Sequence, residues 1–465
     1  MAQSFELLVI GGGPGGYAAA VRGAQLGFKT ACIEAKHLGG ICLNWGCIPT
    51  KSLLRNAEIW ESIQQAEEYG VKFDNVSFDF SRIIARSRGI AERMSKGVAF
   101  LFKKYGVTHI SAYGKLLKPG VVATYDSDGN KLDEVHAKHI ILATGARPRS
   151  IPGIDIDGKQ VISYFEAMSL EQRPETLIVL GAGAIGVEFA YFYNTLGTRV
   201  TIVEMLDHIL PIEDEEVSKE LERSFRKKKM TLKTKTKVEG IERKENGVIV
   251  SVSSSKGSET LEGDVALMAV GVRGNIENLG LEESGVALDR GYIKVDEYCR
   301  TNIPGVYAIG DVVGPPWLAH VATAEGILCV EAIAGKDPHP INYKNIPGCT
   351  YCQPQVASVG FTEKQARETG REIKIGKFPF TASGKAVAAG HPEGFVKLIF
   401  DAQYGELLGA HIIGAEATEL IAEAALGRTF ETTEHELIKT IHAHPTMSEA
   451  IMEAAAVAYG ESVNF

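Results

Sequence analysis

The chain has 465 residues, of which 45% are hydrophobic and 23% charged, as in ordinary soluble globular proteins of roughly two to four domains. Acidic residues outnumber basic ones by 58 to 49, and the pI near 5.8 argues against a general nucleic-acid binder. No run approaches the roughly 18 apolar residues of a membrane span, and seven scattered cysteines favour a reducing, cytoplasmic compartment over a disulfide framework.

The first predicted unit is LLVIGGGPGGYAAAVRGAQLGFKTACIE, residues 7–34, which indicates a strand, a glycine turn, a helix and a second strand ending in Glu34. No basic region precedes the apolar run, so we interpret it as a buried strand rather than a signal peptide. Gly11, Gly13 and Gly16 form G-x-G-x-x-G, in which glycines make the turn, admit a pyrophosphate and pack helix on strand. The pattern predicts a dinucleotide whose phosphates bind at the helix N-terminus.

Two cysteines follow in GGICLNWGCIPTK, residues 39–51. Cys42 and Cys47 are five positions apart, and a helical pattern begins here with Pro49 near its first turn. On a regular helix their Cα atoms would be roughly 8.7 Å apart, beyond the limit of about 7 Å for a disulfide, so a bridge requires a distorted segment. A helix N-terminus beside Cys47 would favour its thiolate. The residues alone leave a structural bridge, half of a metal site, two unconnected core thiols and a redox pair open.

A second copy of the first unit is LIVLGAGAIGVEFAYFYNTLGTRVTIVE, residues 177–204, at a constant offset of 170 positions. Gly181, Gly183 and Gly186 repeat the glycine pattern, and each copy has a carboxylate 18 residues past its last glycine. This context is specific and predicts two dinucleotide sites. Glu204 would accept hydrogen bonds from a ribose 2′-OH and repel a 2′-phosphate, and no arginine follows in MLDHILP. NAD is therefore favoured over NADP.

Two clusters remain in the C-terminal part. Cys349 and Cys352 form a lone Cys-x-x-Cys without a second pair at zinc spacing, so we predict core thiols and no metal site. Farther on, Glu449 opens an apolar helix five residues after His444. A carboxylate that orients a histidine and stabilises its imidazolium is what a general base requires. We predict His444 as the base, Glu449 as its partner and a structural role for His442.

Six motifs in order, GGGPGG, GGICLNWGCIPTK, ATGARP, GAGAIGVEFA, TNIPGVYAIGD and HAHPTMSE, resemble those of the flavin-dependent pyridine nucleotide–disulfide oxidoreductases over essentially the whole chain. The resemblance implies an α/β fold with two Rossmann-like dinucleotide-binding domains, for FAD and NAD, and a C-terminal α/β dimerisation domain. The expected boundaries are 1–147 for the first part of the FAD domain, 148–273 for the NAD domain, 274–340 for the second part of the FAD domain and 341–465 for the dimerisation domain.

The resemblance also implies residue roles. Cys42 and Cys47 would form a reducible disulfide with Cys47 on the flavin side, while His444 and Glu449 would serve the substrate thiol. The residues that match FAD contacts are Gly11, Gly13, Gly16, Glu34, Lys51 with Glu188 as its expected partner, Gly114, Thr144, Gly145, Asp311 and Ala319. Those that match NAD contacts are Gly181, Gly183, Gly186, Glu204, Val238 and Gly271. The stretch GVRGN, residues 271–275, departs from the family pattern Gly-Arg-x-Pro-Asn, which leaves its conformation open.

The implied reaction is oxidation of protein-bound dihydrolipoamide by NAD⁺ to lipoamide, NADH and H⁺. His444 would take a proton from the dithiol, and the thiolate would attack Cys42. Cys47 would pass the electron pair to FAD, from which NAD⁺ receives a hydride. The expected assembly is a homodimer serving the lipoyl-bearing protein and acyltransferase core of a 2-oxo acid dehydrogenase complex or a glycine cleavage system.

Three alternatives stay open at this stage. The nearest is a related NAD(P)H-dependent disulfide reductase with another substrate, such as glutathione or mercuric ion. Glu204 argues against an NADP-linked glutathione enzyme, and no cysteine pair lies near the C-terminus as a mercuric enzyme would have. A non-catalytic structural homologue would not require both cysteines and His444, and a pure NAD-binding module would lack the cysteine pair.

Overall fold

The structure, a computed structural model, describes residues 3–465. Its internal contacts divide the chain into two compact units, each assembled from separate stretches. The first unit contains residues 3–53, 81–149 and 271–341, and the second contains residues 54–80, 150–270 and 342–465. Both units combine helices with sheets, so the predicted α/β class is confirmed. The finer division into four consecutive domains stays a prediction.

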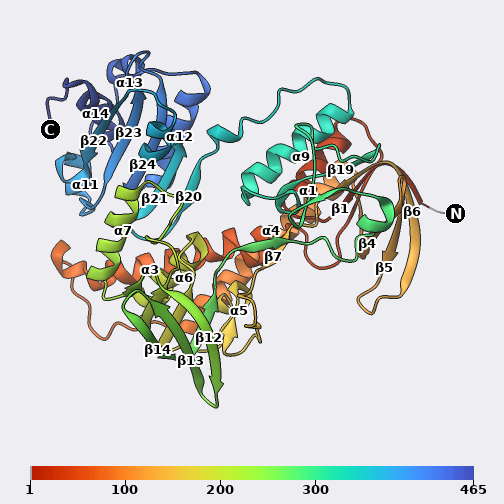
Figure 1. Cartoon of the computed structure of the whole chain (residues 1–465), viewed down its shortest axis with the longest axis horizontal. Helices are drawn as coiled ribbons and strands as arrows, with labels where there is room; N and C mark the ends of the chain where they lie inside the picture. The colour runs from red at the N-terminus through yellow and green to blue at the C-terminus, as the bar shows by residue number, and fades with distance from the viewer. Residues whose placement is uncertain (1–2) are drawn as a thin grey trace. The chain divides into compact units, whose positions relative to one another are not determined.

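The first unit is built on a seven-stranded sheet (Figure 1). Strands β3, β2, β1 and β6 are parallel, β19 pairs in parallel with β6, and β5 and β4 extend the sheet antiparallel. The apolar residues 7–10 of β1 are fully buried, as their uninterrupted pattern predicted. The strands are β1 (Gln3–Ile10), β2 (Thr30–Ile33), β3 (Thr108–Ile110), β4 (Tyr113–Lys118), β5 (Val121–Tyr125), β6 (Lys131–Leu142) and β19 (Val306–Ala308).

Two helices of the first unit pack closely beside the first glycine turn. Helix α1 (Pro14–Gln25) follows β1, and α9 (Ala319–Ile333) lies against it. A Cβ atom on Gly326 would lie only 2.6 Å from the carbonyl oxygen of Gly15, so this close approach requires glycine. Arg22 of α1 and Glu331 of α9 pair across the contact. The two helices therefore hold residues from the two ends of this unit together.

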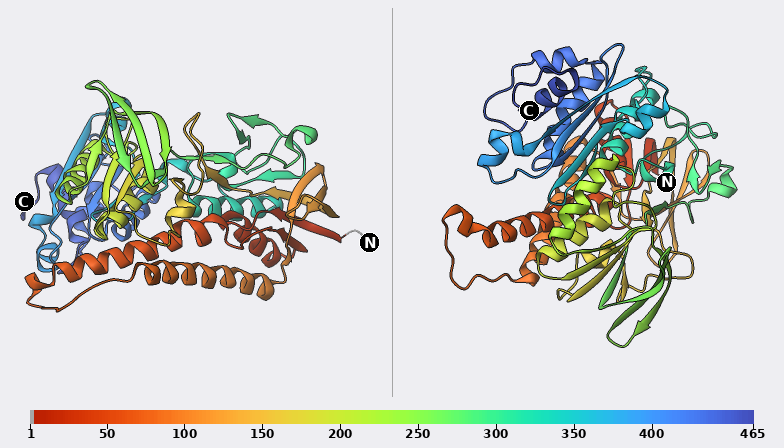
Figure 2. Two further views of the ribbon diagram at one scale, coloured as in Figure 1. Left: turned by 90° about the horizontal axis from the view of Figure 1, so that it is seen from below. Right: turned by 60° about the vertical axis from the view of Figure 1, so that its left-hand side comes forward.

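Three more helices carry the cysteine segment and its support. They are α2 (Gly40–Trp45), α3 (Cys47–Gln64) and the long, unbroken α4 (Phe80–Tyr105), which Figure 2 shows from two sides. Within the first unit, the hydroxyl of Ser87 on α4 donates to the carbonyl oxygen of Pro49 at 2.9 Å. The guanidinium of Arg86 donates to the hydroxyl of Ser52 at 2.8 Å. The first turns of α3 are therefore held by side chains of α4.

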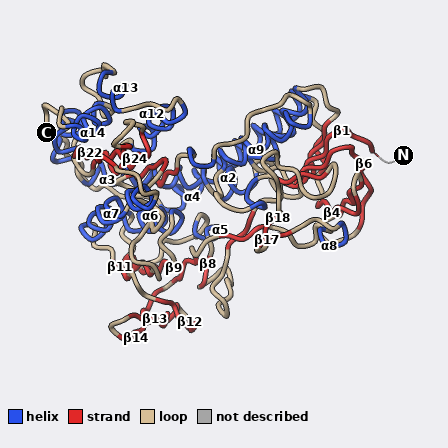
Figure 3. Tube along the Cα trace, turned by 45° about the horizontal axis from the view of Figure 1, so that its top comes forward, coloured by secondary structure: helices blue, strands red, loops and turns tan. Residues whose placement is uncertain are grey.

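The second unit contains a five-stranded parallel sheet in the order β11-β10-β9-β15-β8 and a three-stranded antiparallel sheet, β12-β13-β14 (Figure 3). The strands are β8 (Val161–Ile162), β9 (Thr176–Leu180), β10 (Arg199–Val203), β11 (Thr231–Lys233), β12 (Lys237–Lys244), β13 (Gly247–Ser254), β14 (Gly257–Gly263) and β15 (Val265–Met268). The helices are α5 (Tyr164–Ala167), α6 (Ala184–Thr195) and α7 (Glu215–Lys227). This part repeats the strand–turn–helix start of the first unit.

The second unit also contains a five-stranded antiparallel sheet in the order β20-β21-β24-β23-β22. Helices α12 and α14 pack on it through a shared apolar core, and α7 contacts β24. The strands are β20 (Gly348–Thr350), β21 (Gln355–Gly360), β22 (Ile373–Pro379), β23 (Phe395–Asp401) and β24 (Leu407–Gly414). The helices are α10 (Glu363–Glu368), α11 (Gly384–Ala388), α12 (Ala417–Thr429), α13 (Glu434–Lys439) and α14 (Glu449–Tyr459).

Short elements complete the description. The first unit also contains β7 (Ala146–Pro148), β16 (Val272–Gly274), α8 (Leu281–Ser284), β17 (Leu288–Asp289), β18 (Tyr292–Ile293) and the 3-10 turn η2 (Gly310–Val313). The second contains the 3-10 turns η1 (Ala66–Tyr69), η3 (Tyr343–Asn345) and η4 (Phe380–Ala382). Within residues 3–465, every helix is too short or too polar to cross a membrane.

A buried carboxyl next to α7 predicts how stability depends on pH. Burial raises the pKa of Glu213 from 4.5 to about 7, although a hydrogen bond with Ser358 opposes the shift. Among residues 3–465, its Oε2 atom has no hydrogen-bond partner. Because the folded pKa is raised, the protonated carboxyl stabilises the fold fully below about pH 4.5 and loses this contribution as pH rises through 7. The free energy of unfolding should therefore fall by about 3 kcal/mol between low pH and pH above 7.

We therefore expect Glu213→Gln, which does not titrate, to remove this pH dependence. The variant should melt near wild type at pH 5 and a few degrees above it at pH 8.5, as measured by differential scanning calorimetry. Glu262→Gln, at an exposed site on β14, is the matched control and should follow wild type at both pH values. A constant difference between Glu213→Gln and wild type across this range would contradict the prediction.

Candidate active site

The first glycine loop, between β1 and α1, leaves no room for side chains at two positions. Gly11 has a φ of +108°, and a Cβ atom there would lie 2.2 Å from the carbonyl oxygen of Ala143. A Cβ atom on Gly16 would lie 1.9 Å from the carbonyl oxygen of Gly11. The nearest atom to a Cβ on Gly13 is 3.9 Å away, so the helix N-terminus stays accessible. The loop fits a pyrophosphate held by backbone N–H groups.

The second glycine loop, between β9 and α6, has the same geometry. Gly181 has a φ of +98°, and a Cβ atom there would lie 2.5 Å from the carbonyl oxygen of Ala269. A Cβ atom on Gly186 would lie 2.1 Å from the carbonyl oxygen of Gly181. A Cβ atom on Gly183 would have no neighbour within 4 Å. In both loops, side chains in place of the first and third glycines would meet the backbone. Each glycine loop, here called a dinucleotide cradle, therefore leaves room for the phosphates of a dinucleotide.

Glu34 and Glu204 close the two loops in the same way. One oxygen of Glu34 accepts a hydrogen bond from the N–H of Gly12 at 2.8 Å. One oxygen of Glu204 accepts from the N–H of Ala182, also at 2.8 Å. The second oxygen of each accepts from the N–H two residues farther along the chain, again at 2.8 Å. Each carboxylate is held in place and keeps lone pairs for a ribose hydroxyl.

Asp311 and Glu325 are neighbouring carboxyl groups in the first unit, of which Glu325 is buried and Asp311 is half-buried. Asp311 lies in η2, and α9 begins eight residues later at Ala319. Burial, and then the nearby Glu325, raise the pKa of Asp311 to about 6. Glu325 accepts a hydrogen bond from the N–H of Gly310 at 2.7 Å. Sequence analysis missed Glu325, whose signal is a carboxylate in an apolar helix, where a buried charge requires a partner.

Thr144 and Gly145 follow β6 and are joined to the stretch that departs from the family pattern. The hydroxyl of Thr144 donates to the carbonyl oxygen of Asn275 at 2.8 Å. The side-chain amide of Asn275 donates back to the carbonyl oxygen of Thr144 at 2.9 Å. The backbone N–H of Asn275 donates to the carbonyl oxygen of Gly145, also at 2.9 Å. Residues 271–275 therefore have a defined conformation, with β16 antiparallel to β7. Sequence analysis missed this role of Asn275.

The remaining predicted nucleotide contacts differ in their surroundings. Gly114 lies on β4, where a Cβ atom would lie 3.0 Å from a methyl carbon of Ile10, just before the first glycine loop. Gly271 has a φ of +101°, and a Cβ there would meet no atom within 4 Å. Val238 lies on β12 and packs against an apolar core of the second unit. Their contacts with nucleotides stay predictions.

Cys42 and Cys47 lie on different helices because the helical conformation is interrupted at Gly46. Helix α2 ends before this residue and α3 begins after it. A Cβ atom on Gly46 would lie 3.1 Å from the carbonyl oxygen of Ile41 and 3.3 Å from the Cα atom of Cys42. A side chain here would require its neighbours to move by a few tenths of an ångström, so glycine favours this close fold of the backbone. The distortion that the helix geometry requires for a bridge is therefore present.

Cys42 and Cys47 are hydrogen-bonded to each other in the structure. The contact with Cys47, and then burial, raise the pKa of Cys42 far above its ordinary value, although the ammonium of Lys51 opposes the shift. Cys47 is the first residue of the 18-residue helix α3, where the dipole favours an anion.

The cysteine segment is attached directly to the first glycine loop. The N–H of Gly39 donates to the carbonyl oxygen of Gly12 at 2.7 Å. A Cβ atom on Gly40 would lie 2.7 Å from the Cα atom of Gly13, so the two backbones touch. Lys51 belongs to this unit, whereas Glu188 belongs to the second, where its carboxylate accepts from the N–H of Tyr351 at 3.0 Å. The Lys51–Glu188 pairing stays a prediction.

His444 and Glu449 meet in the second unit as the sequence predicted. The Nδ1 atom of His444 and a carboxylate oxygen of Glu449 are 2.8 Å apart, and the histidine side chain is 78% exposed. The other carboxylate oxygen accepts from the N–H of Thr446 at 2.8 Å. Desolvation raises the pKa of Glu449, but the bonds from Thr446 and His444 outweigh it and hold the pKa below its ordinary value. The carboxylate thus stays charged and orients the ring.

The neighbouring histidine has different surroundings. The side chain of His442 is only 6% exposed, and its Nε2 atom lies 2.7 Å from a carboxylate oxygen of Glu423. Its Nδ1 atom lies 3.0 Å from the carbonyl oxygen of Thr440. Both ring nitrogens therefore have partners, which suits a structural role. Glu423 is a residue that sequence analysis missed, because it lies 19 positions away on α12.

The second cysteine pair lies in the antiparallel-sheet region. Cys352 is buried, and its thiol donates to the carbonyl oxygen of Pro354 at 3.2 Å. Cys349 packs against the apolar core of the C-terminal sheet. Both positions suit the core thiols that the sequence predicted. Among residues 3–465, no three or more histidine, cysteine or acidic side chains are grouped so that they could hold a metal ion.

Comparison with protein families gives two matches that cover most of the chain. Residues 5–326 match the model described as "Pyridine nucleotide-disulphide oxidoreductase". Residues 346–455 match the model for the dimerisation domain of the same family.

Full-length relatives are also found. The chain is 48% identical over 480 residues to a dihydrolipoyl dehydrogenase of Rhizobium etli and 49% identical over 467 residues to one of Zymomonas mobilis. It is 41% identical over 474 residues to one of Bacillus subtilis, and each alignment covers 100% of both chains.

Two solved structures share the fold over nearly the whole chain. The crystal structure of LpdA from Mycobacterium tuberculosis has a TM-score of 0.90 at 30% identity, covering 97% of this chain and 99% of that one. The flavoprotein disulfide reductase RclA from Escherichia coli, solved as a Cu(II) complex, has a TM-score of 0.87 at 26% identity, covering 98% of this chain and 99% of that one.

Proposed function

The chain belongs to the pyridine nucleotide-disulphide oxidoreductase family, and we propose that it oxidises protein-bound dihydrolipoamide to lipoamide while reducing NAD⁺ to NADH. The full-length relatives at 41–49% identity are dihydrolipoyl dehydrogenases, which favours this substrate over glutathione or mercuric ion. The observation that carries the proposal is the attachment of the cysteine segment to the first of two dinucleotide cradles, through Gly39 and Gly12. A redox pair and a nucleotide site are thereby adjacent in one unit.

The roles of the protein groups follow from their contacts. With Nδ1 of His444 directed at Glu449, its Nε2 atom is the one left to accept a proton from the substrate dithiol. The resulting thiolate attacks the sulfur of Cys42, the Cys42–Cys47 bond breaks, and Cys47 leaves as a thiolate. The second substrate thiolate then displaces Cys42 from the mixed disulfide, and Cys42 takes a proton. The products are lipoamide and the reduced cysteine pair.

Two dinucleotides fit the two cradles. FAD is assigned to Gly11, Gly13, Gly16 and Glu34, with Lys51, Gly114, Thr144, Gly145, Asp311 and Ala319 as further contacts, and NAD to Gly181, Gly183, Gly186 and Glu204, with Val238 and Gly271. Bound FAD would supply an electron acceptor for the cysteine pair and a hydride donor for NAD⁺. The protein's part is to hold the phosphates at helix N-termini and the riboses at the two carboxylates.

The proposed assembly is a cytoplasmic homodimer. The match of residues 346–455 to the family's dimerisation domain supports pairing through this region. Its proposed partners are the lipoyl-bearing protein and acyltransferase core of a 2-oxo acid dehydrogenase complex or a glycine cleavage system. We propose that Cys42 and Cys47 of one chain and His444 of the other form each site.

Steady-state turnover with two substrate pairs tests the proposal. The FAD-loaded protein is assayed with dihydrolipoamide and NAD⁺, and in parallel with glutathione disulfide and NADPH. We expect turnover only with the first pair, because the His444–Glu449 pair serves a dithiol and Glu204 disfavours the extra phosphate. Faster turnover with glutathione disulfide would assign the chain to a sibling reductase, and no turnover with either pair would favour a non-catalytic homologue.

Glu204 should determine the choice between NAD and NADP. Backbone N–H groups hold its carboxylate in place. A 2′-phosphate there would be repelled and poorly solvated, at a cost of about 2–4 kcal/mol. The nearby Lys235 already pairs with Asp207 at 3.4 Å. We expect kcat/KM to be roughly 30- to 1000-fold higher with NAD⁺ than with NADP⁺.

The control for this prediction is Glu204→Gln, which keeps the size of the side chain and removes its charge. We expect the ratio of kcat/KM for the two cofactors to narrow, chiefly through better use of NADP⁺. Similar efficiency of the wild-type protein with both cofactors would rule out this role of Glu204.

A further inference from the structure

A row of polar residues crosses the C-terminal sheet at a single level. Ser358 on β21 lies directly opposite His411 on β24, which lies opposite Lys397 on β23, which lies opposite Lys377 on β22. Directly opposed residues of antiparallel strands point to the same face of the sheet. The four side chains, here called the polar row, therefore share a face, although β23 and β24 are buried along their whole length.

The start of α7 lies on this polar row and matches it in charge. Glu213 is hydrogen-bonded to Ser358. The ammonium of Lys397 donates to Asp214 at 2.9 Å. Glu216 accepts from both lysines of the row, each at 2.7 Å. The acidic segment that precedes and opens α7 thus contacts three of the four residues of the row, Ser358, Lys397 and Lys377.

Lys397 is the centre of this contact. Its side chain is 1% exposed, and its ammonium contacts Asp214, Glu216 and Glu363, the last at 2.7 Å. Burial opposes the charge, but the three carboxylates outweigh it and hold the pKa of Lys397 above its ordinary value. A buried ammonium with carboxylate partners on α7 and α10 joins these elements to β23. Removing only the ammonium would leave the buried carboxylate of Asp214 without its counter-ion.

The polar row is connected to the second glycine loop by a short chain of hydrogen bonds. Asp214 caps α7, and its carbonyl oxygen accepts from the N–H of Ser218 at 3.0 Å. The hydroxyl of Ser218 donates to the carbonyl oxygen of Leu210 at 3.0 Å. The N–H of Leu210 donates to the carbonyl oxygen of Ala182 at 2.8 Å, inside the glycine loop. Glu204 accepts from the N–H of the same Ala182.

The first glycine loop shows what such a connection does. There the corresponding carbonyl oxygen, that of Gly12, holds the cysteine segment through Gly39. In the second loop, the corresponding carbonyl oxygen, that of Ala182, accepts from the N–H of Leu210. Leu210 in turn is bonded to Ser218 of α7, the helix that contacts the polar row. The carbonyl oxygen that binds the cysteine segment in one copy of the repeat is therefore connected, through hydrogen bonds and α7, to Lys397 in the other copy.

From these contacts we infer that Lys397 is a positioning residue for the pyridine nucleotide: by holding Asp214, it fixes the loop from Glu204 to Leu210 against the second glycine loop. This inference rests on the proposed function, in which that loop binds NAD. Lys397 touches neither the glycine loop nor its carboxylate, so it acts through α7. Its loss should weaken nucleotide binding and leave the thiol chemistry of the first unit unchanged.

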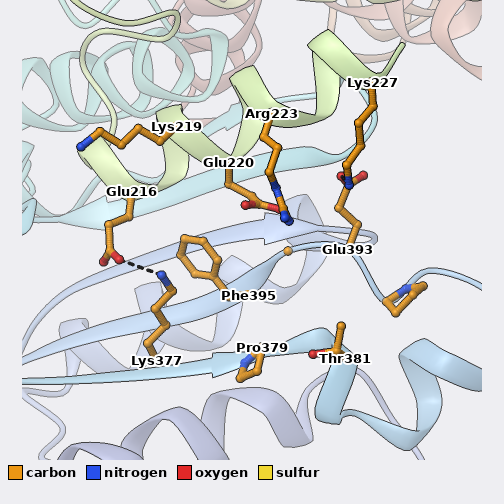
Figure 4. A pocket seen from close by; sticks show the side chains of 12 residues that line it. Glu216, Lys219, Glu220, Arg223, Lys227, Lys377, Pro379, Thr381, Glu393 and Phe395 are labelled. Atoms are coloured by element: carbon orange, nitrogen blue, oxygen red, sulfur yellow. Dashed lines mark hydrogen bonds and ion pairs between the residues drawn. The ribbon is translucent and has the colours of Figure 1, made fainter.

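Lys377 provides a matched control. It belongs to the same row and pairs with Glu216, but it is 41% exposed. Figure 4 shows the Glu216–Lys377 pair beside Phe395, where it lines an open groove of about 630 Å³. Lys377→Met changes the net charge as Lys397→Met does, yet it leaves the buried pair with Asp214 intact. Any general electrostatic effect on an anionic ligand should therefore be the same in both variants.

The experiment measures binding of ADP-ribose to the FAD-loaded protein by isothermal titration calorimetry. ADP-ribose carries the pyrophosphate and the adenosine ribose and transfers no hydride. We expect Kd to rise roughly tenfold in Lys397→Met, within the range of about 2- to 30-fold that changes in such networks produce, and to change less than twofold in Lys377→Met. Reduction of the protein by dihydrolipoamide without NAD⁺, followed by stopped flow, should stay within twofold of wild type in both.

A second variant covers the case in which Lys397→Met does not fold. Asp214→Asn with Lys397→Met removes a charge of each sign, and asparagine still caps a helix. The same weakening of ADP-ribose binding is expected. Unchanged Kd in either folded Lys397 variant, or equal weakening in Lys377→Met, would overturn the positioning role. Failure of the wild-type protein to bind ADP-ribose would instead contradict the proposed function itself.

Discussion

Replacement of Cys47 by serine is expected to lower turnover of dihydrolipoamide by roughly 10⁴-fold or more, the scale seen when a reacting nucleophile is removed. Serine cannot form the bridge with Cys42 or leave as a thiolate, so the substrate thiolate has no disulfide to attack. Affinity for ADP-ribose should be unchanged, because the second glycine loop belongs to the other compact unit. The steady-state assay with NAD⁺ measures the loss.

Counting thiols tests the bridge independently of turnover. The chain has seven cysteines, so the oxidised wild-type protein should show five thiols in denaturant and all seven after reduction. The Cys47→Ser variant should show six in both conditions. Cys349→Ser is the matched control, with four before reduction and six after it. Seven thiols in the wild-type protein purified under oxidising conditions would contradict a bridge between Cys42 and Cys47.

The visible spectrum tests which sulfur lies beside the flavin. In the FAD-loaded protein, we expect two-electron reduction to produce a long-wavelength absorption band from the Cys47 thiolate. Cys42→Ser should show this band without reduction, because Cys47 is then never bridged, and Cys47→Ser should lack it. A band that persists in Cys47→Ser would show that the roles of the two sulfurs are reversed.

Replacement of His444 by glutamine is expected to lower kcat/KM for dihydrolipoamide by roughly 10²- to 10⁴-fold, the usual contribution of a general base. Glutamine can still contact Glu449, but it cannot take a proton at neutral pH. The loss should shrink as pH rises, because an increasing share of the substrate dithiol is then already ionised. His442→Gln is the control: its side chain is buried against Glu423, so it should affect stability more than the pH profile.

Mixed dimers test whether the site is shared between two chains. One chain carries Cys47→Ser and the other His444→Gln, each nearly inactive as a homodimer. In a C₂ dimer with shared sites, one of the two sites combines intact cysteines from one chain with intact His444 from the other. Activity should then return to about half of wild type per dimer. If each chain instead forms its own site, every site keeps one lesion and mixed dimers, confirmed by tag pull-down, stay inactive.

The glycine loops and their carboxylates could be predicted from sequence because their interactions are local. An apolar run, three glycines and a carboxylate lie within 28 residues, and the backbone N–H of the loop meets that carboxylate 22 positions away. The strand–turn–helix path leaves few other arrangements, since side chains on the critical glycines would overlap the backbone. The pairing of His444 with Glu449 spans five residues and is local for the same reason.

For the cysteine pair, the sequence predicted that a bridge would need a distorted segment, but it did not predict the conformation of that segment. Helix geometry required a distortion between Cys42 and Cys47 but did not locate it. The structure places it at Gly46, where the backbone folds back on Cys42. What holds α2 in position is the contact of Gly39 and Gly40 with the first glycine loop, and this contact exists only once strand, loop and helix have packed.

By itself the sequence determined the repeated nucleotide fold, the position of the cysteine pair and the histidine with its carboxylate, because each depends on residues close together in the chain. Only the tertiary structure decided the surroundings of Lys397. In FVKLIFD it resembles a lysine on the polar face of a strand, yet it is buried. Its charge can be buried only because strand register aligns the polar row, and because α7 brings Asp214 from 183 residues away. No local pattern encodes a counter-ion at that distance.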